Sequence, residues 1–489
     1  MLFNSHIFML LFLPLLLAGW YFLNWKKKFQ LAQGYLIGMS LWFYAYANLQ
    51  YLWLLLFSCL IGWLLSCLPE KIFSEKGKKV LTGVGCVFHL GLLGYFKYSN
   101  FFLENLNTVF HTDFPMLQIL LPVGISFYTF QQLAYLIDRC RGDAPRDSFF
   151  DYLTFMVYFP QLLQGPILLR SEFMGQLKEP ERRRFHAERF SEGIQFFVFG
   201  LAKKVLLADT LAKAVNYGYS NVSMLDSISA LLLAVGYLTE LYFDFSGYCD
   251  MAVGLGKMIG LEVAENFDAP FHSASVKEFW RRWHMTLGRF FTRYVYIPLG
   301  GNRRGKMRTL CNVMIVMLLS GLWHGAAWTF VLWGFLHGVG MIWDNLEHPH
   351  LPKKWMRQAA TFAYVCMTFV FFKAESIAQG VDVLKSIVSV KWNGFVFQMA
   401  SALDMTECYI ITKALSMKLP GLLSWFWLGV FVVLIAICFR VLSGEKVSGV
   451  VALQRQKGYG RLYPVLLAVL FTWSMISMTG VSEYLYFSF

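Results

Sequence analysis

Charged residues are scarce in this chain of 489 residues. Only 15% are Asp, Glu, Lys or Arg, whereas 57% are hydrophobic and 18% aromatic, and the mean hydropathy is +0.49. Intrinsic disorder needs many charges and little hydrophobicity, so the composition excludes it. Soluble domains carry about 25% charged residues, and so few charges would not cover the surface of a soluble multidomain enzyme. The composition therefore indicates one polytopic membrane protein.

Motifs for metal and nucleotide binding are also lacking. The nine cysteines form no CxxC pair and no Cys/His spacing typical of zinc, and no HExxH, Walker or GxSxG motif occurs. Cysteines in apolar runs, such as Cys59 and Cys311, are interpreted as small buried hydrophobes. Basic cytoplasmic loops explain the formal net charge of +13, so it does not indicate a nucleic-acid partner. We expect neither a metal nor a tightly bound cofactor.

Uncharged runs near the length of about 20 residues that spans the hydrocarbon recur along the chain. The first, Leu2–Trp25, is too long for a signal peptide and ends in three lysines, so it predicts a membrane helix with the N-terminus outside. The other predicted spans are Phe29–Pro69 (two, with a break near Asn48), Phe114–Ile137 (kinked near Pro122), Tyr152–Leu169, Thr309–Trp343 (nearly two), Leu419–Phe439 and Leu462–Ser482, with shorter candidates at Val80–Phe96 and Gln358–Phe372.

Two further runs are weaker candidates, because charges interrupt them. Phe190–Leu207 contains Glu192, Lys203 and Lys204, and Ile228–Tyr242 contains Glu240. With them, the chain is expected to hold about eleven to fourteen helices in a single domain over residues 1–489. Basic loops between the spans are interpreted as solvated cytoplasmic loops that touch anionic lipid.

One histidine lies inside a long uncharged run. His324 stands near the middle of Thr309–Trp343, between Gly321 and Gly325. Polar groups in the hydrocarbon are costly and usually functional, and a neutral imidazole can take a proton from a hydroxyl and later return it. His324 is therefore a candidate general base, with a structural histidine as the alternative. His337 is interpreted as structural or as a support of the site, because the glycines beside it, Gly334 and Gly338, favour close helix packing and an unbroken helix would place it about 20 Å away.

Basic and aromatic residues alternate along Lys277–Leu299, which reads KEFWRRWHMTLGRFFTRYVYIPL. Such a segment is typical of the membrane interface, where rings lie at headgroup level and cations reach phosphates. The functional alternative is a cationic mouth that collects an anionic donor, with His284 near the reacting centre.

Acidic residues form a third polar group, around FDFSGYCDMAVGLG. Glu240, Asp244 and Asp250 lie in an otherwise apolar segment, where carboxylates need partners. The candidate partners are Arg281, Arg282 and Lys257.

Several stretches of the chain resemble the membrane-bound O-acyltransferase (MBOAT) family, and within it the membrane subunit of bacterial alginate O-acetyltransferases. The most specific are ENFDAPF, EFWRRWHMTLGRFFTRYVYIPLGGNRRG and GLWHGAAWTFVLWGFLHG, and further matches include LPVGISFYTFQQLAYLID and YFDFSGYCDMAVGLGKMIG. They cover about residues 1–345 in the expected order, whereas residues 346–489 show only further helices.

The resemblance implies an all-helical fold around a central funnel and tunnel, in the cell (cytoplasmic or inner) membrane. It matches His324 to the family's catalytic histidine and His284 to a second histidine that lines the site. The donor would be acetyl-CoA or a carrier thioester. Acetyl would leave the far side to a secreted or membrane-anchored partner with a serine nucleophile, which esterifies a polysaccharide hydroxyl.

The residues agree with that chemistry, because a thioester is already activated and needs only positioning and a base. Guanidinium groups attract the phosphates of a donor. The expected donor-binding residues are Arg281, Arg282, Trp283, Arg303 and Arg304.

Two other functions stay open. A D-alanyl transferase of teichoic acids, fed by a carrier protein, shares the RWH and WHG segments, but the YIPLGGNRRG wording and the longer C-terminal region favour the alginate type. A transporter of a polysaccharide or lipid precursor would use His324 as a proton relay. The sequence does not identify the acceptor polymer.

Overall fold

The chain folds almost entirely into helices in a computed structural model that describes residues 1–47, 49–67, 75–346, 352–442, 446–458 and 460–478. Over these residues no strand occurs. The longer helices are α1 (Leu13–Trp25), α2 (Phe29–Ala47), α3 (Leu52–Cys67), α5 (Glu75–Leu93), α6 (Ser99–Phe110), α7 (Ile125–Arg141), α11 (Ala187–Ala202), α12 (Asp209–Ser220), α13 (Ser227–Met258), α16 (Lys306–His324), α17 (Trp328–Asn345), α18 (Lys354–Lys373), α19 (Ile377–Val388), α21 (Tyr409–Lys418), α22 (Pro420–Leu442), α23 (Val447–Lys457) and α24 (Leu462–Ser477).

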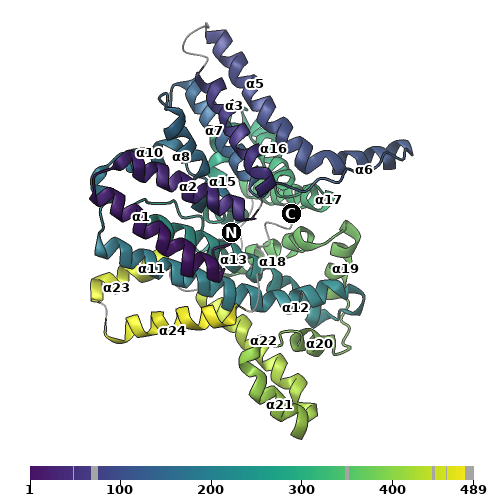
Figure 1. The fold of residues 1–489 in the computed structure, drawn as a ribbon. Helices are drawn as coiled ribbons and strands as arrows, with labels where there is room; N and C mark the ends of the chain where they lie inside the picture. The colour runs from purple at the N-terminus through teal and green to yellow at the C-terminus, as the bar shows by residue number, and fades with distance from the viewer. Residues whose placement is uncertain (48, 68–74, 347–351, 443–445, 459, 479–489) are drawn as a thin grey trace.

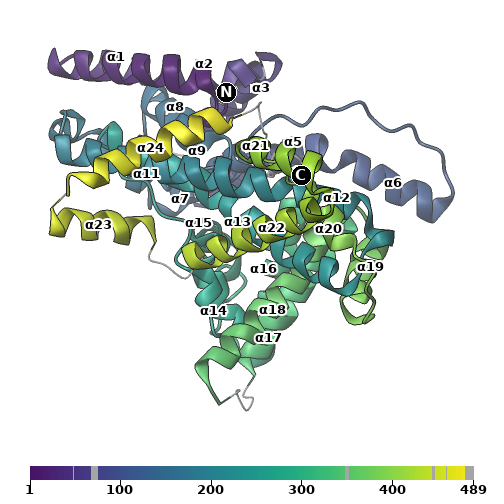
Figure 2. The ribbon, with the colours of Figure 1, turned by 90° about the horizontal axis from the view of Figure 1, so that it is seen from below.

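Short helices connect these elements. They are α8 (Phe149–Val157), α9 (Phe159–Leu162), α10 (Arg170–Leu177), α14 (Val276–Arg282), α15 (Met285–Phe291), α20 (Phe395–Ser401) and the π-helical turns η1 (Phe8–Phe12), η3 (Gly94–Tyr98), η5 (Lys203–Ala208) and η8 (Thr292–Tyr296). α13 runs through the middle of the molecule, while α5–α6 and α21–α22 extend away from it on two sides (Figure 1). α1 and α2 lie along one edge, and α17 and α18 at the opposite edge (Figure 2).

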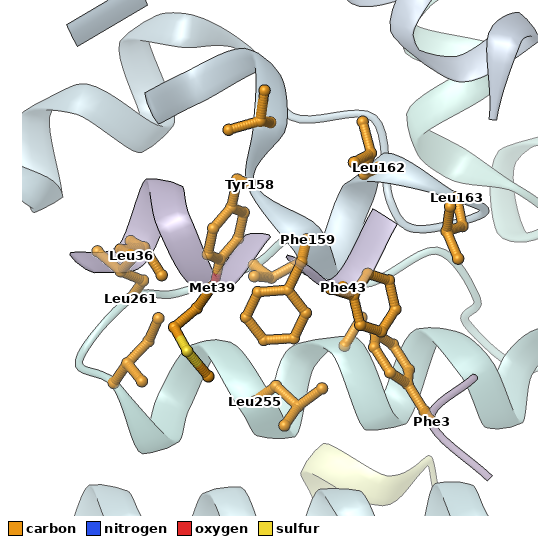
Figure 3. Close-up of a cluster of buried hydrophobic side chains, with 14 of the residues drawn as sticks. Phe3, Leu36, Met39, Phe43, Tyr158, Phe159, Leu162, Leu163, Leu255 and Leu261 are labelled. Carbon is orange, nitrogen blue, oxygen red and sulfur yellow. The ribbon is translucent and has the colours of Figure 1, made fainter. Parts of the chain in front are cut away.

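Helices long and apolar enough to cross a membrane confirm the prediction of a multi-pass all-α protein. Among the described residues they are Phe8–Trp25, Leu49–Cys67, Lys76–Phe110, Ser227–Met258, Lys306–His324 and Pro420–Val441. The first begins later than the predicted Leu2, because the N-terminal segment packs into the core. Phe3 is fully buried there against Phe43 and Phe159 from α2 and α9 (Figure 3). The ends of the predicted runs at 68–69 and 479–482 lie outside the described residues.

Two predicted spans are wrong. Residues 113–124 form no helix, and α7 begins only at Ile125, because prolines interrupt the segment and Gly124 has a positive φ of 78°. Tyr152–Leu169 ends its helix at Leu162 and continues as buried irregular chain. Irregular backbone is tolerated at membrane depth where protein supplies its hydrogen bonds, as Thr286 Oγ1 does for the Ile167 N–H at 3.0 Å. Among the cysteines Cys59 is buried as expected, but Cys311 is exposed on α16.

Glycines let α11 and α13 pack backbone to backbone. Gly193 and Gly200 on α11 face Gly254 and Gly247 on α13, seven residues apart on each helix, as an antiparallel pair requires. A Cβ on Gly200 would lie 2.5 Å from the Gly247 carbonyl oxygen, and one on Gly254 equally close to the Gly193 carbonyl. Small residues of this kind bring membrane helices into close contact. This glycine seam forms the core of the molecule.

Three of the four charges that weakened the two central runs as membrane spans are paired with residues of α13, whereas Glu240 has no hydrogen-bond partner among the described residues. Lys203 Nζ lies 2.6 Å from Asp250 Oδ2, and Lys204 Nζ lies 2.6 Å from Asp244 Oδ1, with both side chains of the second pair 2% exposed. Buried charges persist where they are paired in this way. The expected partners Arg281 and Arg282 are therefore wrong, and Arg282 instead pairs with Glu278 at 2.9 Å. Lys257, the third, pairs with Glu192 on α11.

The basic loops meet at one end of the bundle, called here the basic face. Arg183 donates to the Phe29 carbonyl at 3.1 Å, next to the three lysines after α1. Arg289 bonds Glu172, and Arg455 reaches Glu188 at 2.8 Å. At the other end, Lys213 donates to the Asp404 carbonyl at 3.2 Å, which brings α12 against the segment before α21. Basic residues from the segment before α11, from α15 and from α23 therefore lie together at the first of these two ends.

Candidate active site

His324 is the last residue of α16, a helix that starts at Lys306 on the basic face. Its 19 residues rise about 28 Å at 1.5 Å each, so the imidazole lies deep in the bundle. The residue is 3% exposed. Its ring centroid lies 4.9 Å from Trp323, 5.1 Å from Trp333 and 5.1 Å from Phe372. Three aromatic rings therefore surround the imidazole.

Glycines set the geometry of the α16–α17 hairpin. Gly325–Ala327 break the helix after His324, and α17 returns along α16. A Cβ on Gly334 would lie 2.5 Å from the Met317 carbonyl oxygen and 3.3 Å from the Gly321 Cα, so the two backbones touch. The close helix approach expected from these glycines is therefore observed, and it fixes where His324 stands.

The last carbonyls of α16 are bonded by two residues that the sequence reasoning missed. A helix leaves its final carbonyls without intrahelical donors. Lys97 Nζ donates to the Trp323 carbonyl at 2.7 Å and to the His324 carbonyl at 2.9 Å, while the Tyr98 hydroxyl donates to the Leu322 carbonyl at 2.6 Å. The available signal was a lysine directly after the apolar run Val80–Phe96.

His284 stands between α14 and α15 in a left-handed conformation, with φ 47°. Such a conformation costs a non-glycine residue about 1–2 kcal/mol and needs support from its surroundings. Asn266, in the ENFDAPF stretch, supplies it: its carbonyl accepts the Met285 N–H at 3.0 Å, and its side chain accepts the Thr286 N–H at 3.1 Å. The imidazole is fully buried, and neither ring nitrogen bonds another described residue.

Trp323 connects the two histidines. Its indole lies 4.9 Å from the His324 ring and 6.1 Å from the His284 ring, and Phe245 contacts His284 from α13 at 4.7 Å. The structure thus brings together the two histidines that the sequence singled out. They come from segments forty residues apart.

A cavity of about 60 Å³ borders His324. Its wall comes from Lys97, the segment Leu121–Phe127, Leu163 and Trp323. The segment reaches the end of α2 remote from the basic face, where the Tyr51 hydroxyl contacts the Leu120 carbonyl at 2.5 Å. His324 therefore faces the side of the bundle opposite to the basic loops.

His337 has a structural environment, in agreement with its interpretation. Trp280 Nε1 donates to His337 Nδ1 at 3.3 Å, and Nε2 lies 3.0 Å from the Thr368 hydroxyl, which itself donates to the Val365 carbonyl. Because indole is only a donor, Nε2 carries the proton and donates to Thr368. Both ring nitrogens are engaged.

The predicted donor-binding residues lie in three different environments: a surface depression, an exposed loop and the core. Arg281 and Arg282 border a polar depression of about 480 Å³ on the basic face, together with Asp268 and Glu278. The nearby carboxylates reduce its positive charge. Arg303 and Arg304 are exposed in the loop before α16. Trp283 is 1% exposed and stacks on Phe279 at 5.3 Å, so the structure places it in the core and not at the depression.

Comparisons with known proteins now bear on this arrangement. Residues 141–378 match the model of the membrane-bound O-acyltransferase family. A peptidoglycan O-acetyltransferase of Helicobacter pylori is 35% identical over 423 residues, 80% of this chain and 80% of its own length. The chain belongs to the membrane-bound O-acyltransferase family. It is an O-acyltransferase, and the match contains both histidines and the whole α16–α17 hairpin.

Other members of the family are also similar to it. A probable alginate O-acetylase of Azotobacter vinelandii is 39% identical over 389 residues, 77% of this chain and 76% of its own length. A teichoic acid D-alanyltransferase of Streptococcus thermophilus is 28% identical over 253 residues, 49% of this chain and 58% of its own length.

Proposed function

We propose that this acyltransferase moves an acetyl group from a cytoplasmic thioester to a hydroxyl on the other side of the membrane, with His324 as the general base. The observation that carries the proposal is the buried imidazole beside a cavity of about 60 Å³. A cavity of about 150 Å³ holds a benzene molecule, so this one suits a small acyl group and excludes a fatty chain.

The basic face is the cytoplasmic one in this proposal, because cytoplasmic loops collect Lys and Arg. The N-terminus and the His324 cavity are then on the external side. The membrane is the cytoplasmic (inner) membrane, where cytoplasmic thioesters are in reach.

The chemistry needs little from the protein. The His324 imidazole takes the hydroxyl proton as the oxygen attacks the thioester carbonyl, and later returns it to the leaving thiolate. Such general-base help contributes about 10²–10⁴-fold, and dry aromatic walls strengthen each electrostatic contact. Holding the two reactants together supplies the larger part.

The donor approaches from the basic face in the form of acetyl-CoA or a carrier thioester. Arg281, Arg282, Arg303 and Arg304 are the groups that attract its phosphates. His284, on the Trp323 side remote from the cavity wall, would line the path of the thioester. No tightly bound cofactor enters the proposal.

The acceptor is a hydroxyl of a surface polysaccharide, reached directly or through a partner with a serine nucleophile. Support comes from the printed names of the relatives, which refer to peptidoglycan and alginate. Both are glycan polymers outside the cytoplasm.

The test is CoA release from labelled acetyl-CoA by the purified protein in lipid vesicles. His324→Ala should lower the release rate by at least about 10²-fold while the protein stays folded. His186, an exposed histidine on the basic face, gives the matched control His186→Ala, which should keep the wild-type rate. Full turnover by His324→Ala would contradict the proposal.

Two other results would replace it. Transfer of D-alanine from a carrier protein, with no use of acetyl-CoA, would indicate the teichoic acid type. Passage of an intact precursor through the vesicle membrane without thioester cleavage would indicate a transporter.

A further inference from the structure

Lys97 is a basic residue that contacts the C-terminal end of α16. It has no ion-pair partner among the described residues. It lies in the π-helical turn η3, in the middle of the apolar segment Lys76–Phe110. A lysine in such a segment is costly and usually has a task, and π-helical turns often occur at functional sites.

Part of that task is visible in the contacts of the ammonium group. An ammonium has three N–H donors. Two of them reach the Trp323 and His324 carbonyls at 2.7 and 2.9 Å. The negative end of the α16 dipole favours a cation at this position. One N–H is left over.

The cavity that Lys97 lines is where the remaining N–H donor can act. Lys97 and His324 line the same cavity, and Ile125–Phe127, the first turn of α7, forms another part of its wall. A helix N-terminus carries partial positive charge. The cavity therefore has a base on one side and two sources of positive potential around it, which suits a centre where negative charge develops on oxygen.

We propose that Lys97 is a catalytic residue that stabilises the oxyanion of the acyl-transfer step, which rests on the proposed function. The acceptor oxygen bonds to the acyl carbon as His324 takes its proton, and the carbonyl π pair moves to oxygen. The spare Lys97 N–H bonds that oxyanion. When the pair returns, the C–S bond breaks and the thiolate takes the proton from His324, so the products are an ester and a thiol.

The test measures kcat and KM for acetyl-CoA in vesicles. Lys97→Met should lower kcat by about 10²–10³-fold, as loss of an oxyanion donor does, with KM within about threefold. Tyr98→Phe is the matched control, because it removes a donor to the same helix end but no cation. It should lower kcat by less than about tenfold. An equal loss in both variants would assign Lys97 to holding the helix end alone and overturn the inference.

A second pair of variants covers failure of Lys97→Met to fold. Lys97→Arg keeps a cation and Lys97→Gln keeps N–H donors without charge, so the Arg variant should turn over at least about tenfold faster. Equal rates would overturn the inference. Wild-type turnover that His324→Ala abolishes, with Lys97→Met at full rate, would reject Lys97 and leave the proposed function standing. No wild-type turnover would reject both.

Discussion

α13 and α22 are both long enough to cross a membrane, yet they occupy opposite environments. The apolar stretch of α13 has a mean hydropathy of 1.4, and 78% of it is buried. The apolar stretch of α22 has a mean hydropathy of 2.6, and only 28% of it is buried. The more apolar helix is therefore the more exposed one. In a bilayer, lipid is as apolar as leucine, so hydropathy marks contact with lipid, and small and polar residues mark contact between helices.

Breaking a buried ion pair of α13 should give the largest difference in stability between the buried and the exposed helices. Lys204→Met leaves Asp244 buried without its ammonium, which should cost about 3–5 kcal/mol of stability. On the exposed side, Lys413→Met on α21 should change stability by less than about 0.5 kcal/mol. Thermal unfolding in detergent measures both. Equal shifts would show that burial of the pair is unimportant.

Glycine-to-alanine substitutions in α13 and α22 should change stability by an intermediate amount and in opposite directions. Gly247→Ala would bring a Cβ within 2.7 Å of the Gly200 carbonyl oxygen, and overpacking of this kind costs about 1–3 kcal/mol. Gly429 on α22 has open space around it, so Gly429→Ala should be neutral or stabilising by up to about 1 kcal/mol. Unfolding midpoints of the two variants should move in different directions, and a common direction would break the comparison.

Substitutions in the first turns of α13 and α22 should have the smallest effect on stability. Asp226 caps α13 and also accepts the Asn393 and Gly394 N–H groups at 3.3 and 3.1 Å, whereas the first turn of α22 contains no acidic residue. Burial alone would raise the Asp226 pKa, but these hydrogen bonds outweigh it and hold the pKa below its usual value of 3.8. Asp226→Asn should cost about 1 kcal/mol at neutral pH, because an amide NH2 in place of Oδ2 cannot accept the Asn393 and Gly394 N–H groups.

The pH dependence follows from that lowered pKa. The stabilisation is present above the unfolded-state pKa and is lost as pH falls through the folded one. The difference between wild type and Asp226→Asn should therefore begin to shrink as pH falls below about 4 and disappear once the pH is below the folded-state pKa. A difference that persists at lower pH would show that the carboxylate charge is not what stabilises the turn.

The sequence predicted the fold class and the location of His324 inside the helix bundle, because both depend on local pattern. Composition indicated a bundle of membrane helices, and a histidine inside an apolar run is visible without a structure. The glycines beside it correctly indicated close helix packing.

What the sequence missed depends on contacts between distant segments. Lys97 meets the end of α16 from 226 residues away, and no local pattern contains that contact. The sequence wrongly predicts a span at Tyr152–Leu169, because an uncharged stretch looks the same whether it faces lipid as a helix or lies buried as irregular chain. The same reason explains the wrong partners of Asp244 and Asp250, since the turn η5 provides them from a run that its own charges make a weak candidate.

The length of α16 sets the distance and the orientation of the His324 imidazole relative to the loop before the helix. The helix is held near its start by the hydrogen bond from Asn312 to the Gly301 carbonyl and near its end by glycine contacts with α17. Adding or removing one residue between these anchors would turn the last side chain by about 100° and move it about 1.5 Å along the axis. Substitutions on the lipid-facing side of α16 therefore leave this geometry intact, whereas a change in the length of the helix would turn the His324 side chain away from its cavity.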